Sequence, residues 1–194
     1  MLAEKFEGFE IILASKSPRR QELFKTLGLD FKVMTKDVPE VYPDSLSKQE
    51  ITSYLSELKS NAFGGLQDHQ ILITADTIVW QNNKALEKPA NEKEAYYMLN
   101  SLQGRTHEVI TSFCIRTTAY RATINDTTLV HFNELSSEEM EFYIKNYKPF
   151  DKAGAYGIQE WIGFIGIHKI EGSYFNVVGL PVHKLYKELK NLKL

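Results

Sequence analysis

The chain has 194 residues, a formal net charge of -2 and a 43% hydrophobic composition. This length suits one domain, predicted over residues 1–194, with a sizeable core. The charge gives no overall basicity for nucleic-acid binding, so any anion site must be local. No run is long and apolar enough to span a bilayer, and the one cysteine, Cys114, cannot form an internal disulfide. We therefore expect a cytoplasmic protein that binds neither nucleic acid nor a membrane.

The first predicted element is a buried strand that begins near Ile11 and stops at Ser15. Ser17 is a suitable N-cap and Pro18 a suitable first residue for a helix that closes near Gly28. Two arginines follow, Arg19 and Arg20, although the positive end of a helix dipole favours acids. Phosphate oxygens would satisfy these groups together with free N–H groups. A basic turn in solvent explains the local pattern about equally well.

The middle of the chain alternates between strand and helix patterns. A strand is predicted over 31–35, a loop over 36–47, and a helix that Ser47 and Glu50 cap. Its buried face is predicted to be Ile51, Tyr54, Leu55 and Leu58. The run 71–80 predicts a central strand buried on both faces, a turn follows at Asn82 and Asn83, and Asn91 caps a helix that ends at Leu102.

The second half continues with long strands over 107–118 and 123–135, predicted to be antiparallel neighbours. Ser136 caps a helix to Tyr147, and residues 148–157 form a glycine-bearing loop. A short strand or extended piece is predicted over 174–179, and a final helix over 181–192. Because helices and strands interleave, the residues predict an α/β or α+β fold with a mixed sheet.

Asp76 is the sharpest chemical signal, because it interrupts the most apolar strand. A buried carboxylate needs a cation, hydrogen-bond donors or a proton. It could act as a Mg²⁺ ligand or as a base for water, and a structural aspartate that accepts backbone N–H groups remains the alternative.

Other polar residues are informative only in combination. Lys59 lies on the polar face of its helix, Lys88 precedes Pro89 in a rigid loop, and Gln159 carries an amide that could recognise a base edge. Glu40 adds a loop acid. Together with Asp76 and the arginines, these side chains suit a nucleoside phosphate and a divalent ion. No Walker motif is present, so the residues by themselves predict a phosphate-binding α/β protein, most simply a hydrolase.

Several ordered motifs resemble those of the Maf family of nucleotide pyrophosphatases, over almost the whole chain. They lie at 15–20, 75–79, 87–89, 104–109, 151–159 and 172–181. The resemblance implies an α/β fold with a mixed, elongated central sheet flanked by helices, like that of the inosine-triphosphate pyrophosphatases, and a cleft between two lobes. It also implies hydrolysis of a nucleoside triphosphate at the α–β linkage, and a homodimer.

The resemblance assigns a role to each matching position. Asp76 becomes the catalytic carboxylate, and both Asp76 and Glu40 become candidate ligands of a divalent cation, Mg²⁺ or Mn²⁺. The remaining positions fall into two groups. Arg19, Thr77 and Gln159 match positions associated with base selection, and Ser15, Arg20, Lys59 and Lys88 match a phosphate-facing set.

The residues that follow Ser17-Pro18 and the run 156–159 resemble the subgroup that acts on dTTP and UTP. Two positions depart from the pattern: Pro39 replaces an acid, and Glu160 stands where glycine is usual. The second places a carboxylate next to Gln159, where it could change which base edge is recognised. A 7-methyl-GTP pyrophosphatase and a nucleotide-binding regulator of septum formation are the alternative functions.

Overall fold

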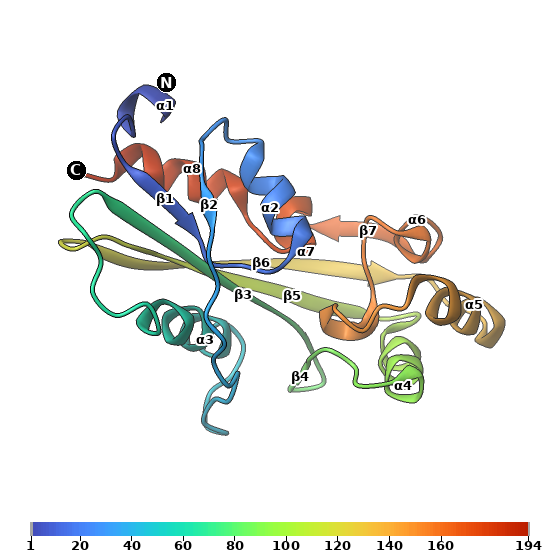
Figure 1. The fold of residues 1–194 in the computed structure, drawn as a ribbon. Coiled ribbons are helices and arrows are strands. Elements are labelled where there is room, and N and C mark those ends of the chain that lie inside the picture. The colour runs from blue at the N-terminus through green and yellow to red at the C-terminus, as the bar shows by residue number, and fades with distance from the viewer. Residues whose placement is uncertain (1, 194) are drawn as a thin grey trace. The chain divides into compact units, whose positions relative to one another are not determined.

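A mixed, seven-stranded sheet organises residues 2–193, the part of the chain that the computed structural model describes (Figure 1). The strand order is β2-β1-β3-β5-β6-β7, and β4 pairs with β3 outside this path. The strands are β1 (Glu10–Leu13), β2 (Lys32–Val33), β3 (Gln70–Gln81), β4 (Lys84–Leu86), β5 (Thr106–Arg116), β6 (Arg121–Phe132) and β7 (Ile167–Glu171). The predicted α/β class with a mixed sheet is confirmed.

Eight α-helices and one 3₁₀-helix precede, connect or follow these strands within residues 2–193. They are α1 (Leu2–Lys5), α2 (Pro18–Lys25), α3 (Gln49–Asn61), α4 (Glu92–Leu102), α5 (Ser137–Tyr147), η1 (Ala153–Ala155), α6 (Trp161–Gly166), α7 (Tyr174–Val178) and α8 (Val182–Asn191). No helix in this range is both long and apolar enough to cross a bilayer.

The chain divides into two compact units. Unit 1 comprises residues 2–76, Thr111–Asp126 and 179–193, and unit 2 comprises Thr77–Ile110 and Thr127–Val178. Strands β3, β5 and β6 contribute residues to both units. The prediction of a single domain over 1–194 stays a prediction.

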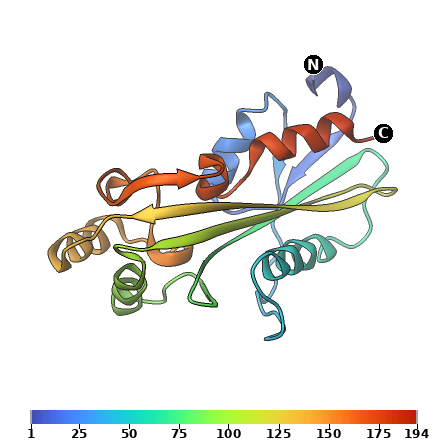
Figure 2. The ribbon, with the colours of Figure 1, turned by 180° about the vertical axis from the view of Figure 1, so that it is seen from behind.

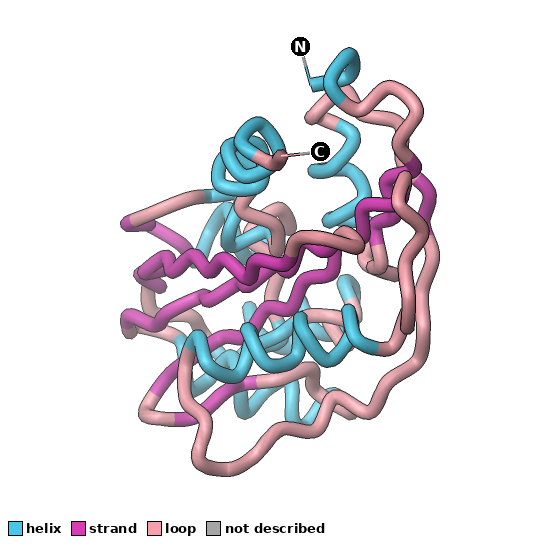
Figure 3. Tube along the Cα trace, turned by 90° about the vertical axis from the view of Figure 1, so that its left-hand side faces the viewer, coloured by secondary structure: helices cyan, strands magenta, loops and turns pink. Residues whose placement is uncertain are grey.

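Unit 1 is built on parallel strands. Strand β1 pairs with β2 and with β3, and Ile11 lies opposite Ile71 in the second ladder. Helices α2 and α8 cover one face of these strands and α3 covers the other (Figures 1 and 3). The view from behind shows α3 and α8 on opposite sides of the strands (Figure 2). Because both faces are covered, β1 and the first part of β3 are almost continuously apolar and buried.

Unit 2 contains antiparallel pairs and a separate apolar core. Strand β4 returns along β3 through Asn82 and Asn83, which both have positive φ angles, as in the tight turns that suit hairpins. Strand β7 pairs with β6. The core joins residues of β3, β5 and β6 to α4 and α5, and it includes Leu99 and Tyr143, both fully buried.

Three local predictions are wrong. The N-cap of α3 is Lys48 rather than Ser47, although the Glu50 carboxylate still accepts a hydrogen bond from the Ser47 N–H at 2.9 Å. Tyr54 is exposed, because the buried stripe of α3 includes Thr52 and Ser56 instead. Residues 174–178 form helix α7 and not an extended piece, and its buried Asn176 donates to the Val109 carbonyl.

Candidate active site

Asp76 lies in β3 just beyond the end of its pairing with β1. The register ends with Leu13 opposite Ile73, and the Ala14 N–H donates to the Ile73 carbonyl at 2.8 Å. The chain then leaves the sheet into the turn that precedes α2. In parallel sheets, ligands bind outside the carboxyl ends of the strands. The turn at residues 15–20 therefore lies beside the strand segment that carries Asp76.

Hydrogen bonds within the turn hold it in one conformation. Ser17 caps α2, as predicted, by accepting from the Arg20 N–H, and the buried Ser15 hydroxyl accepts from the Ser17 N–H at 3.3 Å. Arg20 reaches back to the sheet, where Nη1 donates to the Ala75 carbonyl at 2.9 Å and Nε donates to the Gly179 carbonyl at 2.8 Å. Arg20 thus ties α2 to β3 beside Asp76, and the phosphate-binding role expected of it stays a prediction.

Lys59 connects two carboxylates that lie far apart in the sequence. Its ammonium nitrogen is 2.5 Å from Asp76 Oδ1 and 2.9 Å from Glu40 Oε1. The Lys59 side chain is 16% exposed, so its place on the nominally polar face of α3 does not mean that it is solvated. The structure therefore brings together Glu40, Lys59 and Asp76, and Arg20 is bonded to the carbonyl of the residue before Asp76.

Burial dominates the electrostatics of this cluster. Asp76 is only 6% exposed, and burial raises its pKa above the usual range of an aspartate, while Lys59 and Arg20 partly offset the effect. Glu40 acts in the same direction as burial, since a second negative charge disfavours ionisation. Burial also lowers the pKa of Arg20, and the Asp76 charge opposes that shift. A carboxylate in this environment accepts a proton more readily than one in water.

The donor set fits a hard divalent cation. Asp76 and Glu40 both approach one positive centre, the Lys59 ammonium, and carboxylate oxygens are the ligands that Mg²⁺ and Mn²⁺ prefer. Within residues 2–193 no group of three or more His, Cys, Asp or Glu side chains could hold a metal ion. Mg²⁺ commonly uses one or two carboxylates, with substrate phosphates and waters as the other ligands, so a carboxylate pair suffices.

Arg19 lies in the first turn of α2 in unit 1, and unit 2 holds the other three predicted residues, Thr77, Lys88 and Gln159. Their segments meet within that unit: the Gly154 N–H donates to the Glu87 carbonyl at 3.2 Å, and a Cβ at Gly154 would lie 2.8 Å from a methyl carbon of Val79. The segment before Gln159 therefore packs on the chain next to Lys88 and on the strand just after Thr77. Both Lys88 and Gln159 are exposed.

Polar contacts that the sequence did not indicate hold the segment 152–160. The Lys152 ammonium lies 3.0 Å from Glu160 Oε1, and the Tyr143 hydroxyl donates to Glu160 Oε2. Tyr143 is at a core position of α5, and a buried tyrosine usually finds a partner for its hydroxyl. That rule predicts a partner for Tyr143 but does not identify Glu160.

Known proteins similar to this chain share one name. The chain is 55% identical to a protein of Flavobacterium johnsoniae named dTTP/UTP pyrophosphatase, over 99% of this chain and all of that one. It is 54% identical to a protein of the same name from Christiangramia forsetii, over 99% and 98% of the two chains, and 50% identical to one from Phocaeicola vulgatus, over 98% and 100%.

A solved structure and a family profile complete the comparison. The structure of a HAM1 protein from Coxiella burnetii is similar in fold, with a TM-score of 0.51 and 13% identity over 95% of this chain and all of that one. This likeness supports the fold that the motifs implied. The profile described as Maf-like protein matches residues 10–192. From this match and the similarity to the named relatives, the chain belongs to the Maf-like protein family.

Proposed function

We propose that this protein hydrolyses dTTP and UTP to the nucleoside monophosphate and pyrophosphate. The observation that carries the chemistry is the buried Asp76 carboxylate, held by Lys59 opposite a second acid, Glu40. The substrate class follows from the relatives named dTTP/UTP pyrophosphatase, which are about as long as this chain and match it almost throughout. Two further parts of the proposal are a cytoplasmic location, expected from the composition, and a homodimer, which the family resemblance implies.

In the proposed mechanism Asp76 orients the attacking water and accepts its proton. The water oxygen forms a new bond to the α-phosphorus. The bond from this phosphorus to the oxygen that bridges the α- and β-phosphates breaks, and pyrophosphate leaves. An aspartate in water has a pKa of about 3.9 and is a weak base, so the rise in the Asp76 pKa caused by burial favours proton transfer.

Positive side chains would hold the triphosphate. Lys59 already lies against the Asp76 carboxylate and lowers its pKa. A phosphate oxygen that paired with the Lys59 ammonium would weaken this effect, so Asp76 would become more basic. Arg19 and Lys88 supply further positive charge in their own units, and Thr77 and Gln159 are proposed to contact the base. A divalent ion bound by Asp76 and Glu40 would neutralise phosphate charge and lower the pKa of a bound water.

The test is a panel of nucleotides with identification of the products. Purified protein with Mg²⁺ or Mn²⁺ should convert dTTP and UTP faster than 7-methyl-GTP and release pyrophosphate, and EDTA should stop the reaction. Release of inorganic phosphate with a nucleoside diphosphate would show that a different bond is cleaved. Preference for 7-methyl-GTP would move the protein to the other subgroup, and binding without turnover would favour a regulator.

A further inference from the structure

Glu160 closes the segment 152–160 into a fixed loop. One of its oxygens pairs with Lys152 at 3.0 Å, at the other end of the segment, and its second oxygen accepts from Tyr143. The Lys152 side chain is only 9% exposed and also lies 2.7 Å from the neighbouring Asp151 carboxylate. A lysine buried to this extent needs such partners. The two ends of the segment are therefore joined through side chains.

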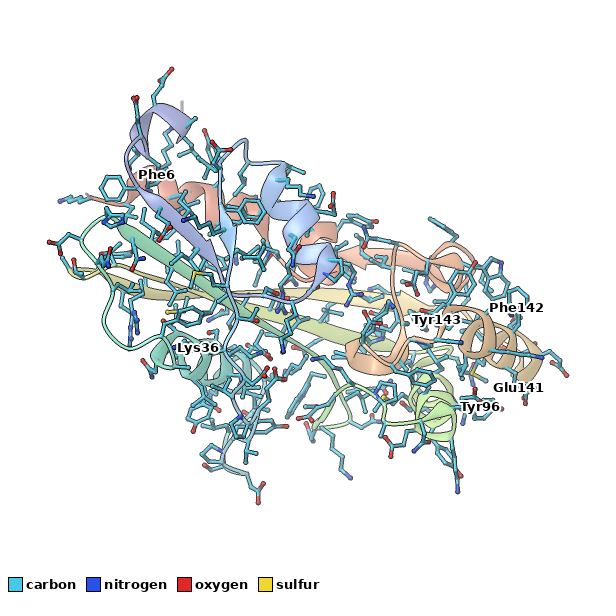
Figure 4. All side chains as sticks on the ribbon, viewed as in Figure 1. Phe6, Lys36, Tyr96, Glu141, Phe142 and Tyr143 are labelled. Carbon is cyan, nitrogen blue, oxygen red and sulfur yellow. The ribbon has the colours of Figure 1, made fainter. Side chains whose placement is uncertain are left out.

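Tyr143 connects the same carboxylate to the middle of the segment. Its hydroxyl donates to Glu160 and accepts from the Gly157 N–H at 3.1 Å. Tyr143 is fully buried and stacks on Tyr147 with ring centroids 5.1 Å apart, so its hydroxyl has a fixed position. In Figure 4, Tyr143 and the exposed Glu141 lie on opposite sides of α5. Gly157 and Glu160 are thus both hydrogen-bonded to one side chain of α5, and Lys152 is joined to them through Glu160.

The packing leaves the segment little room to change. A Cβ at Gly157 would lie 2.9 Å from the Glu160 carboxyl carbon and 3.1 Å from Lys152 Cε. Gly154 and Ala155 both have positive φ angles, 69° and 59°, and the second is unfavourable for a residue with a Cβ. Such a backbone persists only where surrounding contacts maintain it, and the Glu160 and Tyr143 contacts are of that kind.

Gln159 lies directly before Glu160 and is exposed, while Glu160 is held through both carboxylate oxygens. We propose that Glu160 is a positioning residue: through Lys152 and Tyr143 it fixes the backbone that presents Gln159, and so it sets the preference of the protein between dTTP and UTP. This inference rests on the proposed function, which names dTTP and UTP as the substrates. It also gives a physical route for the expectation that a carboxylate next to Gln159 changes which base edge is recognised, because this carboxylate is engaged by two side chains and would act through the backbone.

The test compares three variants that disturb the same contacts differently. Glu160→Ala removes both contacts, Glu160→Gln keeps an acceptor for Tyr143, and Tyr143→Phe removes the hydroxyl from a fully buried ring that a nucleotide cannot reach. Tyr120→Phe is the matched control, because Tyr120 donates to Glu188 in unit 1 in the same kind of tyrosine–glutamate pair.

Two readouts are needed, and neither requires turnover. Amide hydrogen exchange in peptides that cover 152–160 should be faster in Glu160→Ala and Tyr143→Phe than in the wild type. The ratio of the Kd values for dTTP and UTP, measured by calorimetry in EDTA, should change in these two variants, by about tenfold in Glu160→Ala. Glu160→Gln should recover most of the wild-type ratio, and Tyr120→Phe should match the wild type in both readouts.

Two results would overturn the inference. If exchange in 152–160 does not change, the contacts do not hold the segment. If Glu160→Ala changes the ratio and Tyr143→Phe does not, Glu160 contacts the nucleotide directly and is not a positioning residue. A wild-type protein that binds both nucleotides but releases no pyrophosphate would reject the proposed function, and the ratios of Kd values would still decide this inference.

Discussion

Lys59 in unit 1 and Lys152 in unit 2 each lie between two carboxylates, but the two arrangements differ in which charge is buried. Around Lys59 the acid is the buried partner, since the Asp76 side chain is 8% exposed. Around Lys152 the lysine is the buried partner, and the Asp151 and Glu160 side chains are 56% and 25% exposed.

The two lysines also differ in what they join. Lys59 connects a loop, a helix and a strand that are distant in sequence, whereas Lys152 closes one short segment. A buried acid beside a cation is a group prepared to exchange a proton. A buried lysine held by exposed acids stabilises a backbone conformation. One lysine between two acids is therefore proposed to support proton transfer in unit 1 and a fixed backbone in unit 2.

The largest expected effect that tests this contrast is the loss of the buried acid. Asp76→Asn should reduce pyrophosphate release from dTTP by roughly 10²–10⁴-fold, since an amide cannot accept the proton of the attacking water. The measurement is the initial rate of pyrophosphate release at saturating dTTP. The protein should remain folded, because removing a negative charge that burial disfavours does not weaken the core.

Asp126→Asn is the matched control for this variant. Asp126 also pairs with a lysine in unit 1, at 2.7 Å from Lys184, but it lies outside the cluster around Asp76. We expect its turnover to equal that of the wild type. Unchanged turnover in Asp76→Asn would mean that Asp76 is a structural aspartate.

A smaller effect should separate the two lysines. In Lys59→Met the ammonium that lowers the pKa of Asp76 is lost, so the acid limb of kcat/KM should move to higher pH and kcat/KM should fall by about 10–100-fold at its optimum. In Lys152→Met the acid limb should stay in place while the protein becomes less stable, by about 1–3 kcal/mol, because Glu160 and Asp151 lose their partner.

Full pH profiles and thermal unfolding of both variants provide the measurement. An equal shift of the acid limb in both would contradict the distinction between the two lysines.

The smallest expected effect concerns stability alone and unit 2. His107 is 2% exposed, its Nε2 is 2.7 Å from the Tyr156 hydroxyl, and burial lowers its pKa from 6.5 to about 3. Between these two values the unfolded chain binds the proton and the folded chain does not, so the free energy of unfolding falls as the pH falls. The slope from this one group is about 1.4 kcal/mol per pH unit.

In His107→Gln the free energy of unfolding should therefore fall less steeply from pH 6 to pH 4, with a slope smaller by about 1.4 kcal/mol per pH unit. Urea unfolding at several pH values measures this slope. The control is His183→Gln, which makes the same substitution at an exposed histidine in unit 1. An unchanged slope in His107→Gln would mean that another group carries the acid sensitivity.

Local patterns predicted most elements because their causes are local. The predicted N-caps Ser17, Asn91 and Ser136 are confirmed. Each side chain accepts a hydrogen bond from the backbone N–H three residues later, and this contact does not depend on tertiary packing. Residues 174–178 were wrongly predicted as extended, because their helix is stabilised by Asn176, which donates to β5 and β6. The stripe on α3 was partly wrong, because its small hydroxyl residues pack inward: Thr52 is hydrogen-bonded to Ser112 at 2.6 Å.

The groups available for chemistry can be read from the sequence: a carboxylate within an apolar strand, a basic helix start, and family motifs in order. Which of these charges meet depends on the packing of distant elements. Lys59 was expected on a polar helix face and is found against Asp76 and Glu40, and Glu160 is joined to Lys152 and Tyr143. The physical reason is that periodicity reports which face of an element is buried, whereas the partner across a contact depends on how distant elements pack.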